Sequence, residues 1–155
     1  MWAIVLALFV VALDQGTKWL VSVRLEEFKE YPVIEGFFSL QFVRNPGAAF
    51  GMLENQRWLF ILVSIGAVCG MLYYLRLPEG KHRMVRWALG LLMGGAVGNL
   101  IDRVRFAKVV DFFLFYWRDY VFPNFNVADI AINFGVGLFI LHLILTGEKA
   151  RREGI

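Results

Sequence analysis

The sequence is poor in the residues that most often build metal, disulfide or nucleophilic sites. It has one cysteine, Cys69, and two histidines, His82 and His142, which lie far apart along the chain. A single cysteine cannot form an internal disulfide, and neither histidine belongs to a motif with metal-ligand spacing. We therefore expect no metal and no other cofactor. We interpret Cys69 as a small packing residue within an apolar run.

Charge is also scarce. Charged residues make up 19% of the chain and hydrophobic residues 59%, whereas soluble domains carry about 25% charge and roughly 45–50% apolar residues. The mean hydropathy is +0.59, which excludes an ordinary soluble domain. The net charge of +3 comes from bases that flank apolar runs. Such bases orient a protein in a membrane, so we expect no nucleic-acid partner.

Internal repeats, linkers and low-complexity segments are missing, so the 155 residues form a single predicted domain. A cleaved signal peptide at the start is disfavoured, because the basic n-region is missing and the apolar run continues past Lys18. About 20 apolar residues suffice to cross a bilayer. We predict four spans with connecting segments, as follows: spans at about 2–23, 58–76, 86–103 and 126–146, outer excursions at 24–57 and 104–125, a cytoplasmic loop at 77–85 and a cytoplasmic tail at 147–155.

The fold class predicted from these runs is mainly α and integral to the membrane. The bases of Arg76–Arg86 and of the tail fall on one side after four crossings, and a high density of bases marks the cytoplasm. Both termini are therefore placed in the cytoplasm. Within the first outer excursion, alternation from Phe38 to Val43 predicts a half-buried strand.

Small residues predict where the helices approach one another closely. Gly66 and Gly70 are four residues apart in the second predicted span, and Gly90, Gly94 and Gly98 share one face of the third. Small residues at this spacing let helix backbones come together in a membrane. We expect both sets to pack against a neighbouring helix.

Polar residues gather at the outer ends of the predicted spans. Asp14 and Lys18 lie four apart, on one helix face, and are expected to pair either as a simple interfacial ion pair or as an inward-facing pair. Asp102 and Arg103 are expected to form a structural pair at the end of the third span. The remaining polar residues of this region are Asn45, Asn99, Asp111, Asn126 and Asp129. Ionisable groups at this depth are costly and usually mark function.

Asp111 and Asp129 are interpreted as the working pair. Two carboxylates that share a site cannot both ionise easily, so one keeps a proton and can act as an acid while the other acts as a base. The alternative is that these groups only join helix ends by hydrogen bonds. A proton-coupled transporter would place its aspartates nearer the bilayer midplane, between repeats. A non-catalytic assembly subunit would explain the glycines but not the carboxylates.

Five separated motifs, in order, resemble those of the lipoprotein signal peptidases (signal peptidase II) over nearly the whole chain. They are Asp14-Gln15 with Lys18, Asn45-Pro-Gly-Ala-Ala-Phe50, Gly95-Ala-Val-Gly-Asn-Leu-Ile-Asp-Arg103, Val109-Val-Asp-Phe112 and Phe125-Asn-Val-Ala-Asp129. Each motif alone is weak, but five in order between four spans are specific. One departure is Phe106-Ala107-Lys108, where many relatives carry a glycine.

The resemblance implies a four-helix aspartyl endopeptidase of the bacterial plasma membrane, with a small extracytoplasmic β-rich cradle and no metal. It also implies removal of the signal peptide from diacylglyceryl-modified prolipoproteins, just before the lipidated cysteine. The implied catalytic dyad is Asp111 and Asp129, with the active site facing the extracytoplasmic side. The implied supporting or substrate-binding residues are Asp14, Lys18, Asn45, Asn99, Asp102, Arg103 and Asn126. Lipid-modified prolipoproteins and membrane lipids are the expected partners, and a monomer is the expected state.

The outer excursions are expected to meet both the membrane and the substrate. We expect Phe112, Phe113, Phe115 and Trp117 to rest on the outer leaflet beside the two aspartates. The segment Phe37–Phe50 is expected to close over the bound peptide, with the lipid approaching laterally between spans.

Overall fold

The computed structural model describes residues 2–47 and 56–152, with side chains as far as residue 147. Along the chain the elements are α1 (Trp2–Arg24), β1 (Glu30–Ile34), β2 (Phe38–Asn45), α2 (Arg57–Tyr74), the 3₁₀ turn η2 (Glu79–Lys81), α3 (Arg83–Phe106), β3 (Val109–Trp117), β4 (Tyr120–Val121) and α4 (Val127–Arg152). Four helices in the described part of the chain are long and apolar enough to cross a membrane. This agrees with the predicted mainly α membrane fold.

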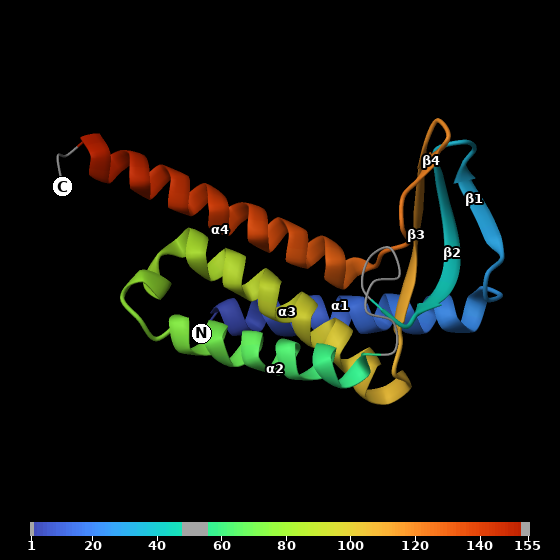
Figure 1. Ribbon diagram of the computed structural model, residues 1–155, viewed down its shortest axis with the longest axis horizontal. Helices are drawn as coiled ribbons and strands as arrows, with labels where there is room; N and C mark the ends of the chain where they lie inside the picture. The colour runs from blue at the N-terminus through green and yellow to red at the C-terminus, as the bar shows by residue number, and fades with distance from the viewer. Residues whose placement is uncertain (1, 48–55, 153–155) are drawn as a thin grey trace.

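Helix α3 is the centre of the bundle. It packs most extensively against α4 and α1, and also against α2. Figure 1 shows the sheet standing at one end of the helices, while α1 begins and α4 ends at the opposite end. The polar residues predicted to form the site all lie toward the end that carries the sheet.

Glycines explain why α3 can be central. A Cβ at Gly90 would lie 2.9 Å from the carbonyl oxygen of Ala3, and a Cβ at Gly94 would lie 2.6 Å from the Val10 side chain, so both positions need glycine for α1 to pack there. The predicted close packing of this face is confirmed. The prediction for Gly66 and Gly70 is wrong, because a Cβ at either would meet nothing within 4 Å.

The third predicted span, 86–103, is shorter than helix α3 in the structure. The helix begins three residues before position 86 and ends three residues after position 103. The His82 side chain accepts a hydrogen bond from the Met84 backbone N–H, which caps the start of the helix. Ala107 takes a left-handed conformation (φ 59°) and ends it. Helix α4 likewise continues to Arg152, into the predicted tail. Cys69 is exposed on α2 and is therefore not the packing residue expected.

The four strands form one antiparallel sheet in the order β1-β2-β3-β4. The predicted strand from Phe38 is confirmed as β2, but its alternation is broken. The register between β2 and β3 shifts between Leu40 and Val43, which is the signature of a bulge. As a result Phe42 and the polar Ser39 are both buried.

A small apolar cluster fastens the sheet to the end of α1. It consists of Val21 from α1, Phe42 from β2, and Val110 and Phe112 from β3. Phe112 is only 3% exposed, so the expectation that it rests on the outer leaflet is wrong. Side chains alternate between the two faces of a strand, and the face of β3 that carries Phe112 is the one turned into this cluster.

Candidate active site

A buried lysine connects α1 to α3. The Nζ of Lys18 lies 2.9 Å from an Asp14 oxygen and 3.0 Å from an Asp102 oxygen, and it donates a hydrogen bond of 2.9 Å to the side-chain oxygen of Asn99. The side chains of all three charged residues are at most 3% exposed. The expected pairing of Asp14 with Lys18 is present, as the inward-facing alternative.

The expected pair between Asp102 and Arg103 is not formed. Successive helical residues point about 100° apart, so Asp102 turns toward Lys18 while Arg103 turns to another side of α3. The Arg103 guanidinium lies 4.6 Å from the centre of the Phe60 ring and donates to the carbonyl oxygen of Gly47 at 3.4 Å. Within the described residues, Lys18 is the cation that pairs with Asp102.

The two carboxylates bound to the lysine also fix the elements that follow. Asp14 accepts the backbone N–H of Ala128 at 3.0 Å, in the first turn of α4. Asp102 accepts the N–H of Val110 at 3.0 Å, in the first residues of β3. Gly98 leaves room for Asp14, since a Cβ there would lie 2.5 Å from its oxygen. These contacts position the strand that carries one candidate catalytic aspartate and the helix that carries the other.

Gln15 belongs to the same network, although sequence reasoning did not assign it to the site. Its side-chain amide contacts Asp14 at 3.2 Å, Asp102 at 3.0 Å and the carbonyl oxygen of Gly98 at 3.1 Å. Its place beside Asp14 in the first motif was the only available signal. The network is complete: the described residues contain no buried side-chain nitrogen or oxygen without a hydrogen-bond partner.

Asp129 is held at the start of α4 by two residues. Its Oδ2 accepts the backbone N–H of Asn126 at 3.1 Å, while the Asn126 side-chain oxygen accepts the backbone N–H of Asp129 at 3.0 Å. This reciprocal arrangement is a capping box that starts the helix. The other Asp129 oxygen accepts a hydrogen bond of 2.8 Å from Asn99. Asp129 is thereby both a helix-capping residue and a wall of the candidate site.

Asp111 is held by two amides, one on each oxygen. Asn126 donates to its Oδ1 at 2.6 Å, and Asn45 donates to its Oδ2 at 3.0 Å. The Asn126 amide also lies 3.2 Å from the side-chain oxygen of Asn99. The structure thus brings the predicted residues Asn45, Asn99 and Asn126 together around the two aspartates.

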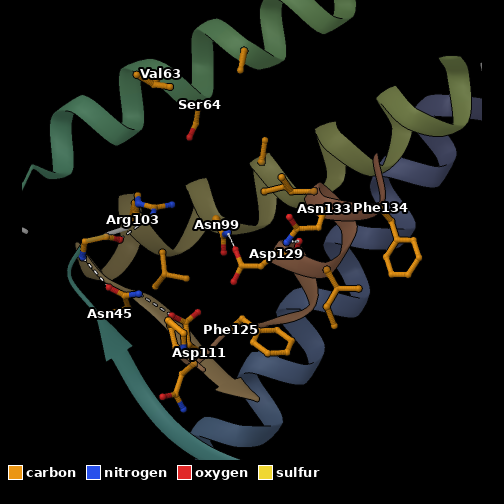
Figure 2. Close-up of a pocket in the computed structure, with 18 of the residues that line it drawn as sticks. Asn45, Val63, Ser64, Asn99, Arg103, Asp111, Phe125, Asp129, Asn133 and Phe134 are labelled. Carbon is orange, nitrogen blue, oxygen red and sulfur yellow. Dashed lines mark hydrogen bonds between the residues drawn. The ribbon is translucent and has the colours of Figure 1, made fainter. Parts of the chain in front are cut away.

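Asp111 and Asp129 line the same cavity, which has a volume of about 730 Å³. Figure 2 shows both carboxylates on one side of it, with Val63 and Ser64 of α2 facing them across the gap. The cavity is also lined by Asn45, Ala67, Asn99, Arg103, Phe122, Phe125 and Phe134. The cavity therefore joins a polar floor to apolar walls supplied by α2 and α4.

Burial, and after it the neighbouring negative charge of Asp129, raise the pKa of the Asp111 carboxyl to about 7. Hydrogen bonds from Asn45 and Asn126 oppose this rise because they favour the charged form. Asp111 consequently keeps its proton under conditions in which a solvated aspartate has lost it. A carboxylic acid beside a second aspartate is an arrangement suited to acid–base catalysis.

Arg57 is another residue that sequence reasoning missed. From the first turn of α2 it donates to the carbonyl oxygens of Arg103 at 2.9 Å and Val104 at 2.6 Å, in the last turns of α3. Helix ends leave carbonyl groups without helical partners, and a basic side chain satisfies them. No motif marked this contact. The motif residues Ala48–Phe50 lie outside the described residues.

The family model described as signal peptidase II matches residues 6–145. The chain belongs to this family. A lipoprotein signal peptidase of Symbiobacterium thermophilum is 61% identical over 149 residues, covering 96% of this chain and 98% of that protein. One of Bacillus pumilus is 40% identical over 153 residues, covering 99% of both.

Two solved structures of bacterial membrane enzymes share the fold of this chain. A bacterial membrane enzyme superposes with a TM-score of 0.87 at 33% identity, covering 95% of this chain and 90% of that one. A second bacterial membrane enzyme gives a TM-score of 0.79 at 33% identity. Membership in a signal peptidase II family of aspartic peptidases decides in favour of an enzyme over the transporter and the assembly subunit considered above.

Proposed function

We propose that this signal peptidase II cleaves the signal peptide from diacylglyceryl-modified prolipoproteins, at the bond before the lipid-modified cysteine, with Asp111 and Asp129 as the catalytic dyad. The observation that carries the proposal is that both aspartates line one cavity while amides hold their oxygens in place. General acid–base catalysis needs a proton donor and a proton acceptor within reach of one substrate bond.

The raised pKa of Asp111 assigns the two roles. Asp129, as the ionised partner, takes a proton from a water molecule, whose oxygen attacks the carbonyl carbon of the residue before the cysteine. Asp111 donates its proton to the carbonyl oxygen, and a tetrahedral diol forms. Asp129 then protonates the amide nitrogen while one diol hydroxyl returns a proton to Asp111. The C–N bond breaks, which releases a carboxylic acid and the free amine of the cysteine and restores the dyad.

The supporting residues have separate tasks in this proposal. Asn45, Asn99 and Asn126 orient the two carboxylates. Lys18, with its two carboxylate partners Asp14 and Asp102, holds the strand and the helix that carry the dyad. Arg103 lines the cavity, where its positive charge stabilises the partial negative charge on the substrate carbonyl oxygen while water attacks. One chain supplies all of these residues, so a monomer suffices for activity.

The cavity also accounts for a lipid-bearing substrate. Its walls on α2 and α4 are formed largely by apolar side chains such as Val63, Ala67 and Phe134. Tyr74 of α2 contacts Phe139 of α4 toward the far end of the bundle, with ring centres 6.0 Å apart. The two helices therefore meet away from the sheet and leave the cavity between them nearer the sheet. A lipid-modified precursor enters laterally through this gap, because its acyl chains leave a bilayer at a cost of about 0.8 kcal/mol per CH₂.

We place both termini in the cytoplasm and the sheet with the active site on the extracytoplasmic side. Single cysteines introduced at Glu35 and Asp119, both exposed on the sheet side, should react with a membrane-impermeant maleimide added outside intact cells. A cysteine at the exposed Lys81 should react only after the membrane is opened. The natural Cys69 is replaced by serine in all variants because it is exposed. Asp14 is unsuitable as a probe because it is fully buried. Labelling in the opposite order would reverse the orientation.

The activity itself is tested with purified protein in lipid nanodiscs. A precursor that carries a diacylglyceryl cysteine is compared with the same precursor unmodified. We expect cleavage immediately before the cysteine, identified by mass spectrometry, and a much lower kcat/KM for the unmodified precursor. Equal kcat/KM for the two precursors would contradict the requirement for lipid, and no cleavage of either would contradict the function.

A further inference from the structure

A row of aromatic side chains continues the face of β3 that carries Asp111. Residues two apart along a strand share a face, so Phe113, Phe115 and Trp117 follow Asp111 outward along the sheet. The Phe113 ring centre lies 5.5 Å from that of Phe125, and the Phe115 ring stacks on Phe125 at 5.7 Å. The candidate catalytic strand therefore leads directly from a carboxyl group into a surface of aromatic rings.

These rings surround a second cavity, which we name the aromatic pocket. Its lining residues are Phe37, Phe115, Tyr116, Trp117, Phe122 and Phe125, and its volume is about 530 Å³. Phe122 and Phe125 also line the cavity that holds the two aspartates. The aromatic pocket thus adjoins the candidate active site and shares two wall residues with it, and its volume falls within the range of small-molecule sites.

The chemistry of the aromatic pocket selects an apolar occupant. The Tyr116 hydroxyl and the Trp117 indole N–H are the polar side-chain groups among its lining residues. A peptide backbone placed among the rings would leave most of its N–H and C=O groups without side-chain partners, which is costly. A hydrocarbon chain has no such groups. Trp117 is 65% exposed and Phe122 46% exposed, so an occupant would cover apolar surface that is now open.

We propose that the aromatic pocket receives one acyl chain of the lipid-modified precursor during cleavage. This inference rests on the proposed function, because that substrate carries two acyl chains, through a glyceryl group, on the side chain of the cysteine that follows the scissile bond. Two apolar spaces adjoin the proposed dyad: the part of the active-site cavity between α2 and α4, and the aromatic pocket. The first lies between two helices that are long and apolar enough to cross a membrane. The second holds a chain against the strand that carries Asp111 and so fixes the cysteine relative to the dyad.

The geometry leads to a kinetic expectation. A chain that moves from lipid into an aromatic pocket exchanges one apolar environment for another, so the gain appears as positioning of the scissile bond more than as affinity. Opening one wall of the pocket should therefore lower kcat more than it raises KM. It should also weaken the dependence of the rate on acyl-chain length.

Crosslinking locates the chain without requiring catalysis. A precursor whose acyl chains end in a diazirine is bound to the Asp111→Asn variant in nanodiscs, irradiated, and the labelled peptides are identified by mass spectrometry. Asp129→Asn serves as a second inactive variant. We expect labels within residues 113–125 and at Phe37. Phosphatidylglycerol carrying the same diazirine chain is the control for ordinary membrane lipid.

Kinetics test the same idea in active protein. Precursors with acyl chains of 8, 12, 16 and 18 carbons are cleaved by wild type, Trp117→Ala and the matched control Trp19→Ala. Trp19 is as exposed as Trp117, at 67%, but lies on α1 outside the pocket. We expect Trp117→Ala to lose about tenfold in kcat for the 16-carbon precursor and little for the 8-carbon one, with Trp19→Ala close to wild type.

Three results would overturn the proposal: labels confined to α2 and α4, equal labelling by phosphatidylglycerol, or the same chain-length dependence in Trp117→Ala as in wild type. A failure of the proposed function is recognised separately, since wild type would then leave every lipid-modified precursor uncut.

Discussion

Two pairs of aspartates lie toward the same end of this bundle in very different surroundings. Asp14 and Asp102 share the ammonium group of Lys18 and accept backbone N–H groups. Asp111 and Asp129 are held mainly by side-chain amides and border a cavity. In the described residues they form no ion pair at contact distance.

The difference shows how one residue type is given two tasks. The Lys18 ammonium and two backbone N–H groups bind the oxygens of the first pair and join them to α1, α4 and β3. Amides orient a carboxyl group but leave its proton available. The first pair is therefore suited to holding elements in place and the second to chemistry. Lys18 stands between the pairs, because its contact with Asn99 reaches the amide that holds Asp129.

The largest expected effect falls on the second pair. Asp111→Asn and Asp129→Asn should each lower kcat by at least about 10³-fold, since loss of either half removes the acid–base pair. The double variant should be little worse than either single one, because the two groups act as a unit. Cleavage of the lipid-modified precursor and melting in detergent measure activity and folding together. A single variant with near-normal turnover would remove that aspartate from the dyad.

The next effect concerns the first pair. Lys18→Met should destabilise the protein by roughly 3–5 kcal/mol, because it leaves two buried carboxylates without their cation. Thermal unfolding in detergent measures the loss. Lys29→Met is the matched control, since Lys29 also pairs with a carboxylate, at 2.7 Å, but on the surface. It should melt like wild type. An unchanged melting temperature for Lys18→Met would mean that the buried pair does not hold the fold.

A pH profile distinguishes the pairs in another way. With a pKa of about 7 in the folded state against 3.8 for an ordinary aspartate, Asp111 binds its proton more tightly when folded. The stability it contributes therefore falls as pH rises from about 4 to 7. The kcat/KM should fall about tenfold per pH unit above 7, as the acid form is lost. Asp111→Asn should remove the stability trend, and a profile flat to pH 9 would contradict the assignment of Asp111 as the acid.

The smallest expected effect is at Arg57. Replacement by alanine removes two hydrogen bonds from a charged donor to carbonyls of α3, each worth about 1.5–3 kcal/mol at most. Arg57 is partly exposed, and solvent weakens these hydrogen bonds, so we expect the free energy of unfolding to fall by about 1 kcal/mol. KM for the lipid-modified precursor should rise, because α2 forms one wall of the cavity. Arg57→Lys, which keeps one contact, should lie between. An unchanged KM in Arg57→Ala would show that this contact does not fix the position of α2 as a wall of the cavity.

Much of this arrangement was predictable from local spacing. The interval from Asp14 to Lys18 places both on one face, and Gly90, Gly94 and Gly98 predicted a face for close helix packing, which α1 occupies in the structure. The partner of Asp102 was not predictable, because its choice between the adjacent Arg103 and Lys18 on another helix depends on how α1 and α3 rotate against each other. The spacing of residues within one helix does not predict how that helix is rotated against another.

The sheet shows a second limit. The bulge between Leu40 and Val43 lets Ser39 and Phe42, three residues apart, both be buried, and strand alternation alone does not locate a bulge. An aromatic residue in an outer excursion, such as Phe112, can lie either at the membrane surface or in a core. In the structure Phe112 packs in a core cluster with Val21, near the end of α1. The failed expectation for Gly66 and Gly70 has a related cause, because a small-residue spacing permits close packing without specifying that a helix is there.

The bond between Asp14 and the backbone of Ala128 joins positions 114 residues apart. It links α1 to the first turn of α4, and that turn contains Asp129. Because Asp111 precedes α4 in the chain, the proposed dyad can be completed only after α4 has reached α1 during folding. A growing chain that lacks this contact carries Asp111 without its proposed partner, so the proposed activity requires α1 and α4 to have come together.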